Sequence, residues 1–239
     1  MIWELAYKVG VDSLGIWKPY LFPSPIDVFN SLKELILDNT LIIAVIISLK
    51  RLIIGYFASL IIGITLGLII VRYKYIDEHL GSMILGLQTL PSICWLPFAI
   101  LWFGLNEKSI IFVIMIGSIF AISIATESGI KNVNPIYLKA AKTMGAKGFR
   151  LYYNVIIPSA LPSVISGMKQ GWSFAWRGLM AGEMLFATKG LGQVLMAGRE
   201  LADISQVVTV MIVIVILGLS IDKLIFSRIE SNIRHRWGL

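Results

Sequence analysis

Charged residues are scarce in this sequence. Asp, Glu, Lys and Arg together make up 15% of its 239 residues, whereas 57% of the residues are hydrophobic. A soluble domain carries about 25% charged residues. So little charge cannot cover a water-facing surface of this size. A protein whose whole surface faces water is therefore excluded, and lipid must be a large part of the solvent.

Cysteine and histidine are almost absent, with one cysteine, Cys94, and two histidines, His79 and His235. A single cysteine excludes an internal disulfide and gives no metal cluster. Because Cys94 lies in an apolar run, we expect it to be a small buried side chain. The apolar segments contain no histidine and no paired acids, which argues against an intramembrane enzyme.

No phosphate-binding loop of the form Gly-x4-Gly-Lys-Ser/Thr occurs in the sequence. If the chain works with ATP, the ATPase must therefore be another polypeptide. The formal net charge of +7 would suggest nucleic-acid binding in a soluble protein. In a membrane protein, basic residues collect on the cytoplasmic side instead. We expect no catalytic residue, no metal and no nucleic-acid partner.

Five apolar segments have the length needed to cross a hydrocarbon core, which takes about 20 helical residues. They lie within 41–71, 83–103, 110–126, 158–180 and 207–226. The sequence therefore predicts an all-α, polytopic transmembrane helix bundle of about five spans. We divide the chain into an extracytoplasmic or interfacial segment, 1–40, and a transmembrane domain, 41–239.

Residues 26–38 precede the first span and have helical periodicity, with Ile26, Phe29, Leu32, Leu35 and Ile36 on one face. This pattern predicts an amphipathic helix on the membrane surface, in contact with lipid. A soluble helix that covers a loop fits nearly as well.

Lys and Arg are distributed unevenly between the two sides of the predicted bundle. The loops at 72–80 and 127–157 and the tail from residue 223 hold 11 of these residues, whereas the segments on the other side hold 6. Since basic residues favour the cytoplasmic side, we expect the loop at 127–157 and the C-terminus to be cytoplasmic, in a cell (inner or cytoplasmic) membrane.

Two spans carry small residues at every fourth position. One stripe consists of Gly55, Ser59, Gly63 and Gly67, and the other of Ser163, Gly167, Gly171 and Ala175. Small side chains let helix backbones approach closely in lipid. The stripes therefore predict a compact bundle, and the same packing would suit a second copy of the chain.

The second span contains Pro91 and Pro97, each of which removes an amide donor and kinks a helix. Broken helices at membrane depth occur where they are buried or line a cavity. Two interpretations stay open: the span forms part of a pathway wall, or the kinks are structural.

The loop at 127–157 has the pattern of a helix, a turn and a second helix. Asn134 and Pro135 are typical of a helix start, and Gly145 is a typical terminator. A second short helix fits 149–157, before Pro158. A short basic helix held at the membrane face is suited to insert into a partner's groove. The alternative is a surface loop without a partner.

The same loop contains Lys139-Ala140-Ala141, then Gly145, and then Val155-Ile156-Ile157-Pro158. This spacing resembles the cytoplasmic signature of ABC importer permeases: Glu-Ala-Ala, three residues, Gly, nine residues, Ile-x-Leu-Pro. Lys139 stands where the family carries glutamate. The resemblance implies a coupling helix that grips a separate ATPase. The residues that it assigns to ATPase coupling are Lys139, Ala140, Ala141, Lys142, Gly145, Ala146, Lys147, Arg150 and Pro158.

Further motifs occur in order along the chain: Leu21–Pro25, Ser48–Arg51, Leu90–Pro97, Leu101–Gly104, Ala175-Trp176, Glu183 and Gly190–Gly192. Their order resembles the nitrate, sulfonate, taurine and bicarbonate permease group. Members of that group usually have one more transmembrane helix before the Pro-Ser-Pro turn. Either the start is truncated here, or this chain works with five spans.

This resemblance implies ATP-driven import of a small anionic solute by alternating access. Two permeases, either two copies or a copy and a paralogue, would bind ABC ATPase subunits that hold ATP and Mg, and an extracytoplasmic solute-binding protein. The signature loop also occurs in ABC permeases for amino acids, vitamins or vitamin precursors, so these cargoes stay open. A membrane scaffold protein is a more distant alternative.

Polar and aromatic residues at membrane depth are candidates for the substrate pathway, because intramembrane ionisable groups are costly. We expect Arg177 to meet an anion, with Glu183 as its partner or as a gate element. A structural pair, or side chains that snorkel to the interface, is the alternative. The candidate pathway residues are Gln88, Thr89, Trp95, Trp172, Trp176, Arg177 and Glu183.

Overall fold

The structure is a computed structural model that describes residues 2–13, 15, 18, 21–186 and 188–237. Helices and their connections make up this described part of the chain, in which no strand occurs. The all-α prediction is confirmed. Residues 1, 14, 16–17 and 19–20 of the predicted N-terminal segment lie outside the described residues.

The helices follow one another with short connections. The first half of the chain contains α1 (Ile2–Tyr7), the π-turn η1 (Lys8–Ser13), α2 (Pro25–Leu37), α3 (Thr40–Arg72), α4 (Lys74–Ile76), η2 (Asp77–Gly81), α5 (Ser82–Gln88), the 3₁₀ turn η3 (Ser92–Trp95) and α6 (Leu96–Phe103). The second half contains α7 (Glu107–Lys131), α8 (Pro135–Thr143), α9 (Phe149–Leu151), η4 (Tyr152–Ile156), α10 (Ile157–Leu185), α11 (Leu191–Glu200), α12 (Ile204–Ile221), η5 (Asp222–Phe226) and α13 (Ser227–Trp237).

Within the described residues, three helices are long and apolar enough to cross a membrane. They are α3, α7 and the continuous helix over Ile204–Ile233. The helix α10 has a comparable length of 29 residues, but it is more polar. The fold is therefore a bundle of several membrane helices, and the count of five spans stays a prediction.

The predicted span at 83–103 is not one continuous helix. The segments Lys74–Gln88 and Ser92–Phe103 meet at an angle of 105°, with Pro91 at the break. Pro97 lies instead in the first turn of α6, where its missing amide is not needed. The prediction that both prolines kink the span is wrong for Pro97. Cys94 is exposed rather than buried as expected, because it lies in η3 at the bend.

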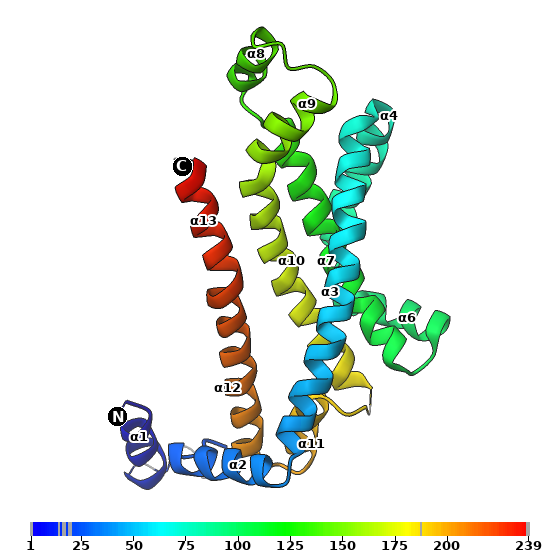
Figure 1. Cartoon of the computed structure of the whole chain (residues 1–239). Helices are drawn as coiled ribbons and strands as arrows, with labels where there is room; N and C mark the ends of the chain where they lie inside the picture. Colours follow the sequence, from blue (N-terminus) through cyan, green and yellow to red (C-terminus); the bar gives the residue numbers. More distant parts are fainter. Residues whose placement is uncertain (1, 14, 16–17, 19–20, 187, 238–239) are drawn as a thin grey trace.

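The long helices run side by side, so the bundle has two ends. Figure 1 shows α3, α7 and α10 as neighbours, with α12 and α13 beside them. At one end lie α2 and α11, and at the other lie α4, α8 and the end of α13. We refer to these as the α11 end and the α8 end.

The small-residue stripe of α3 packs against α7. A Cβ added to Gly55, Gly63 or Gly67 would lie 2.7, 2.9 and 2.6 Å from side-chain atoms of α7, and Ser59 is fully buried. The hydroxyl of Ser123 donates to the carbonyl oxygen of Gly63 at 2.9 Å. The first stripe therefore joins two helices of one chain.

The stripe of α10 packs against a neighbouring face of α7. A Cβ on Gly167 would lie 2.0 Å from Cβ of Ala125, and one on Gly171 would lie 2.9 Å from Ile122. Ser163 lies beside Gly129. The structure confirms the close packing predicted from both stripes and places it within the chain, not between two copies.

The predicted helix at 26–38 is α2, and it begins with a capping box formed by Ser24 and Asp27. Its buried residues are Val28 and Leu35, whereas Ile26 and Phe29 are 66% exposed. The carbonyl oxygen of Val28 accepts a hydrogen bond from Thr209 of α12 at 3.0 Å. Ile26, Phe29 and Ile36 of the predicted apolar face are exposed, as residues in contact with lipid would be, whereas Leu35 of the same face packs inward. The contact of α2 with lipid stays a prediction.

Candidate functional site

The loop at 127–157 contains a well-capped short helix, α8. The side chain of Asn134 accepts the N–H of Ile136 at 2.9 Å, and Pro135 is the first helical residue. Gly145 ends the helix with φ of 83°, a left-handed conformation that suits glycine. The N–H of Ala146 donates to the carbonyl oxygen of Ala141 at 2.9 Å, which is typical of a Schellman ending. The predicted start and stop are confirmed.

The surface of this loop combines positive charge with apolar side chains. The exposed basic residues are Lys139, Lys142, Lys147 and Arg150. Met144 and Phe149 are 87% and 81% exposed, and Ala140 is exposed too, whereas Ala141 is buried. Figure 1 shows that α8 projects beyond the long helices. Exposed apolar groups on a projecting helix are typical of a protein-docking surface.

The predicted second short helix does not end before Pro158. The elements α9, η4 and α10 follow without a break, from Phe149 to Leu185. Pro158 lies in the first turn of α10, directly after the π-turn η4. A π-turn takes up an extra residue where the regular hydrogen-bond pattern is interrupted, so proline is tolerated there. The loop at 127–157 is therefore continuous with a long helix of the bundle.

A cavity of about 590 Å³ separates α8 from the start of this long helix. We call it the α8 cavity. Its lining includes Asn134 and Ala141 on the α8 side and Pro158, Ser159 and Pro162 on the α10 side. It opens at the α8 end of the bundle.

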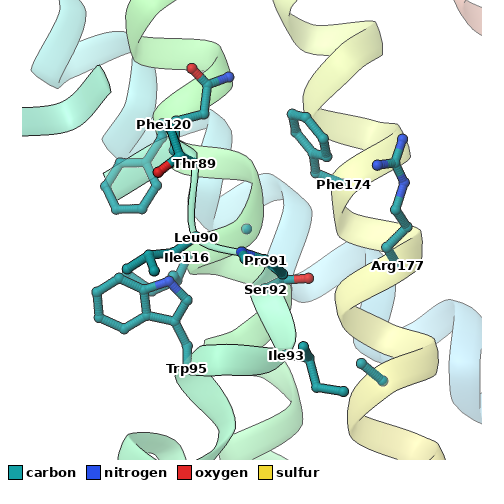
Figure 2. A pocket seen from close by; sticks show the side chains of 13 residues that line it. Thr89, Leu90, Pro91, Ser92, Ile93, Trp95, Ile116, Phe120, Phe174 and Arg177 are labelled. Carbon is teal, nitrogen blue, oxygen red and sulfur yellow. The ribbon is translucent and has the colours of Figure 1, made fainter. Parts of the chain in front are cut away.

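A second cavity, of about 400 Å³, lies between α10 and the bend at Pro91. We call it the Arg177 cavity. It brings together Gln88, Thr89, Trp95 and Arg177, four of the seven predicted pathway residues. Figure 2 shows Phe174 and Arg177 on α10, across from the segment that holds Thr89 and Ser92. The broken span therefore lines a cavity.

The Arg177 cavity has a positive charge and several hydrogen-bonding groups. The guanidinium of Arg177 lies over the ring of Phe174, 5.0 Å from its centroid. Gln88 and Ser92 add an amide and a hydroxyl to the lining. Among the described residues that line it, none is acidic. This combination suits a small anion and not a cation.

Trp172 and Trp176 lie outside the Arg177 cavity. Both are buried, at 7% and 8% exposure. Trp172 packs edge-on against Tyr56, with ring centroids 4.9 Å apart, and its ring lies 6.1 Å from that of Phe226. They share the inward face of α10 with Ala175. The structure therefore places these two predicted pathway residues in the apolar core.

Glu183 does not pair with Arg177. Its side chain is fully buried and accepts a hydrogen bond from Arg51 at 2.9 Å. The hydroxyl of Ser48 and the N–H of Gly192 also lie within hydrogen-bond distance of this carboxylate. The expectation of an Arg177–Glu183 pair is wrong, because Arg51 of α3 neutralises Glu183 from the opposite side of α10.

Arg51 completes a polar cluster that joins four helices. Its guanidinium also donates to Glu107 of α7 at 3.0 Å and to the carbonyl oxygen of Lys189 at 2.8 Å. A Cβ on Gly190 would lie 2.4 Å from the Glu183 carboxylate. Three motifs that lie far apart in the sequence, Ser48–Arg51, Glu183 and Gly190–Gly192, thus meet in one buried cluster. Sequence reasoning noted these motifs without finding their contact.

The family model described as "Binding-protein-dependent transport system inner membrane component" matches residues 59–235. The chain belongs to this family. It is therefore a membrane protein and a transmembrane permease subunit of an ABC importer.

Individual comparisons agree with this assignment. The permease is 35% identical over 235 residues to a protein of Methanocaldococcus jannaschii named as an ABC transporter permease, with 92% of this chain and 88% of that protein covered. It is 30% identical over 212 residues to the nitrate import permease protein NrtB of Synechocystis, with 85% and 77% covered. A solved structure of the inward-facing methionine ABC transporter MetNI shares the fold, with a TM-score of 0.68 and 19% identity over 82% of this chain and 97% of that one.

Proposed function

We propose that this permease imports a small oxyanion of the nitrate or sulfonate kind, and that the anion contacts Arg177 during passage. The observation that carries the proposal is the Arg177 cavity, whose lining combines a guanidinium with amide and hydroxyl groups. In the part of the chain that the structure describes, Arg177 makes no ion pair with an acidic residue. Its charge is therefore free for a ligand.

A guanidinium binds a planar or tetrahedral oxyanion through two parallel N–H donors. The ring of Phe174 supports the guanidinium from one side through a cation–π contact, so the outward edge stays free for the anion. The name of the nitrate import relative supports the same class of cargo.

The α8 end faces the cytoplasm in this proposal. The loops at 72–80 and 127–157 and the C-terminal helix hold the excess of Lys and Arg, and Figure 1 shows them at the same end of the bundle. Basic residues are retained on the cytoplasmic side of membrane proteins. The α11 end then faces the extracytoplasmic binding protein.

The partner at the α8 end is an ABC ATPase, which binds ATP and Mg. A pair of permeases, identical or paralogous, docks through α8 on a pair of ATPase subunits, and closure of the ATPases moves α8. The bundle then alternates between an inward-open and an outward-open state, which is rigid-body switching and not chemistry in this chain.

The docking is tested by purification of the permease from its native membrane in mild detergent, with mass spectrometry of the proteins that copurify. We expect an ATPase subunit with the native chain and none with Gly145→Leu, because a side chain at φ 83° distorts the end of α8. Gly218→Ala is the matched control, since an added Cβ there has no neighbour within 4 Å. If Gly145→Leu folds and still retains the ATPase, α8 is not the docking element.

The cargo is tested by uptake of labelled nitrate, taurine and a neutral amino acid in cells with and without the chain. We expect chain-dependent uptake of an oxyanion that Arg177→Gln reduces. Lys50→Gln is the control, because Lys50 is an exposed cation of α3 that does not line the cavity. Chain-dependent uptake of the neutral amino acid alone would replace the oxyanion proposal by the amino-acid or vitamin alternative.

A further inference from the structure

One face of α10 is polar over residues 163–177, although the helix lies in the membrane bundle. Its residues are spaced by three or four positions and are exposed: Ser163, Ser166, Gln170, Ser173 and Arg177. This spacing places them on one side of an α-helix. We call them the polar face of α10.

The polar face connects the two cavities. At one end, Arg177 lines the Arg177 cavity, and at the other end Ser159, one turn before Ser163, lines the α8 cavity. The rise of an α-helix puts Ser159 and Arg177 about 27 Å apart. The thickness of a hydrocarbon core is about 30 Å. The polar face therefore bridges nearly the full apolar depth of a bilayer.

Contact with lipid does not explain the polar face. The exposed face of α12 shows what lipid favours: Met211, Val215, Ile216 and Leu219 are all apolar and 54–57% exposed. Amide and hydroxyl groups without water or a protein partner are costly in hydrocarbon. In contrast to α12, α10 exposes Gln170 and three serines. The Ser173 hydroxyl donates to the carbonyl oxygen of Lys169 at 3.4 Å. Within the described residues, Gln170 and Ser166 make no side-chain hydrogen bond, so these two groups need water or a polar partner beside them.

The charges around this face favour an anion. Arg177 is the cation on the face itself. Lys169 of α10, next to Gln170 of the polar face, forms an ion pair with Asp222 of η5 at 3.2 Å. The two charges therefore neutralise each other. The acidic residue of α10 is Glu183, and Arg51 neutralises it in the buried cluster. Hydroxyl and amide groups can donate to an oxyanion without binding it too tightly to release.

From these observations we infer that the cargo travels along the polar face of α10, from the Arg177 cavity past Ser173, Gln170 and Ser166 to the α8 cavity at the cytoplasmic mouth. The inference rests on the proposed function for its direction and cargo class. The α8 cavity is then the exit beside the ATPase-coupling helix, so the same motion that moves α8 changes the width of the exit.

The test uses cysteine accessibility in the full-length permease, purified with its copurifying subunits and placed in lipid nanodiscs. Cys94 is first replaced by alanine, and single cysteines are introduced as Ser166→Cys, Gln170→Cys and Ser173→Cys. Val215→Cys on the lipid-exposed face of α12 is the matched control. The probes are two membrane-impermeant methanethiosulfonates, one anionic and one cationic, which react with thiols in contact with water.

We expect all three positions on α10 to react and Val215→Cys to stay unreacted until the protein is denatured. After correction for intrinsic reactivity, the anionic probe should react faster than the cationic one at Ser173→Cys, by about tenfold or more, because a charged cleft concentrates counter-ions. Adding Arg177→Gln should remove this preference.

The route is wrong if the three positions react only after denaturation, or if they form disulfides between two copies while the probes are excluded. The polar face would then be a dry contact with a second permease. These outcomes separate the route from the cargo. If the three cysteines do not react but the cells take up an oxyanion, the route is wrong and the cargo class stands. If the cysteines react with a preference for the anionic probe but no oxyanion is taken up, the cargo class is wrong and the route stands.

Discussion

Two arginines of the long helices, Arg51 of α3 and Arg177 of α10, have opposite surroundings. The side chain of Arg51 is 6% exposed and donates to two carboxylates and a backbone carbonyl. Arg177 is exposed, lies over an aromatic ring and lines a cavity. Burial of an arginine in a bilayer costs free energy. Within the described chain, fixed acidic partners compensate this cost for Arg51 only.

This difference separates an arginine with fixed counter-ions from one that has none among the described residues. The partners of Arg51 come from α7, α10 and the segment before α11, so this cation holds the α11 end of the bundle together. Arg177 contacts the ring of Phe174 on its own helix and, among the described residues, joins no other helix through an ion pair. Intramembrane charge alone therefore does not identify a transport site, and the role of Arg177 in transport is the proposal that the variants below test.

The largest expected effect is that of Glu183→Ala on folding. This change leaves Arg51 buried without its main partner and should lower the free energy of unfolding by about 3–5 kcal/mol. The thermal midpoint of the detergent-purified chain measures the loss. Glu200→Ala, which removes an exposed carboxylate of α11, is the control and should leave the midpoint unchanged.

Replacing both Arg51 and Glu183 by methionine sharpens the same comparison. Because the double variant buries no unpaired charge, it should recover part of the midpoint lost in Glu183→Ala. A double variant that is no more stable than the single one would mean that the pair is not the source of the stabilisation.

Gly190→Ala should have the next largest effect on stability. Its Cβ would lie 2.4 Å from the Glu183 carboxylate, so the cluster must open to accept it, at a cost of about 1–3 kcal/mol. Gly218→Ala, where the added Cβ has open space, provides the reference midpoint. Equal midpoints for the two variants would show that the cluster accommodates a methyl group at Gly190 without loss of stability.

Unlike the variants of the Arg51 cluster, Arg177→Gln should leave the thermal midpoint unchanged and slow oxyanion uptake. Loss of a charge-assisted hydrogen bond to the passing anion should reduce uptake by about tenfold. Arg177→Lys should restore part of the rate, since it keeps the charge but loses the two-donor geometry. If Arg177→Gln unfolds the chain, Arg177 belongs with Arg51 as a structural residue.

Glu107→Gln should have the smallest effect. Its side chain is 47% exposed although it contacts Arg51, and water screens such a pair, so the loss should stay below about 1 kcal/mol. Thermal midpoints compared with those of Glu183→Ala give the ratio between the two carboxylates. A loss as large as that of Glu183→Ala would show that Glu107 is the principal counter-ion.

The sequence predicted what depends on local pattern. The limits of α8 followed from Asn134, Pro135 and Gly145, whose roles are set by backbone conformation and capping. The small-residue stripes also predicted close helix contacts, because a row of small side chains at every fourth position lets two backbones approach. The first span also followed from its apolar length.

The sequence could not predict which distant residues meet. Glu183 lies six positions from Arg177, so proximity along the chain suggested that pair. Six positions are not a whole number of helical turns, so the two side chains leave α10 in different directions. Glu183 points toward α3, and Arg177 points toward the bend at Pro91. The partner, Arg51, lies 132 positions away. Likewise, tryptophan suits both a pathway wall and a core, and only packing assigned Trp172 and Trp176 to the core.

The unbroken helix from Phe149 to Leu185 is about 55 Å long by the rise of an α-helix. Close contacts with α7 at Gly167 and Gly171 leave it little room to bend along its middle. The π-turn η4 and Pro162 lie toward its α8 end, where such features allow a helix to bend. From Ser163 to Leu185 the helix is regular, so a tilt near Ser163 moves Glu183 as well.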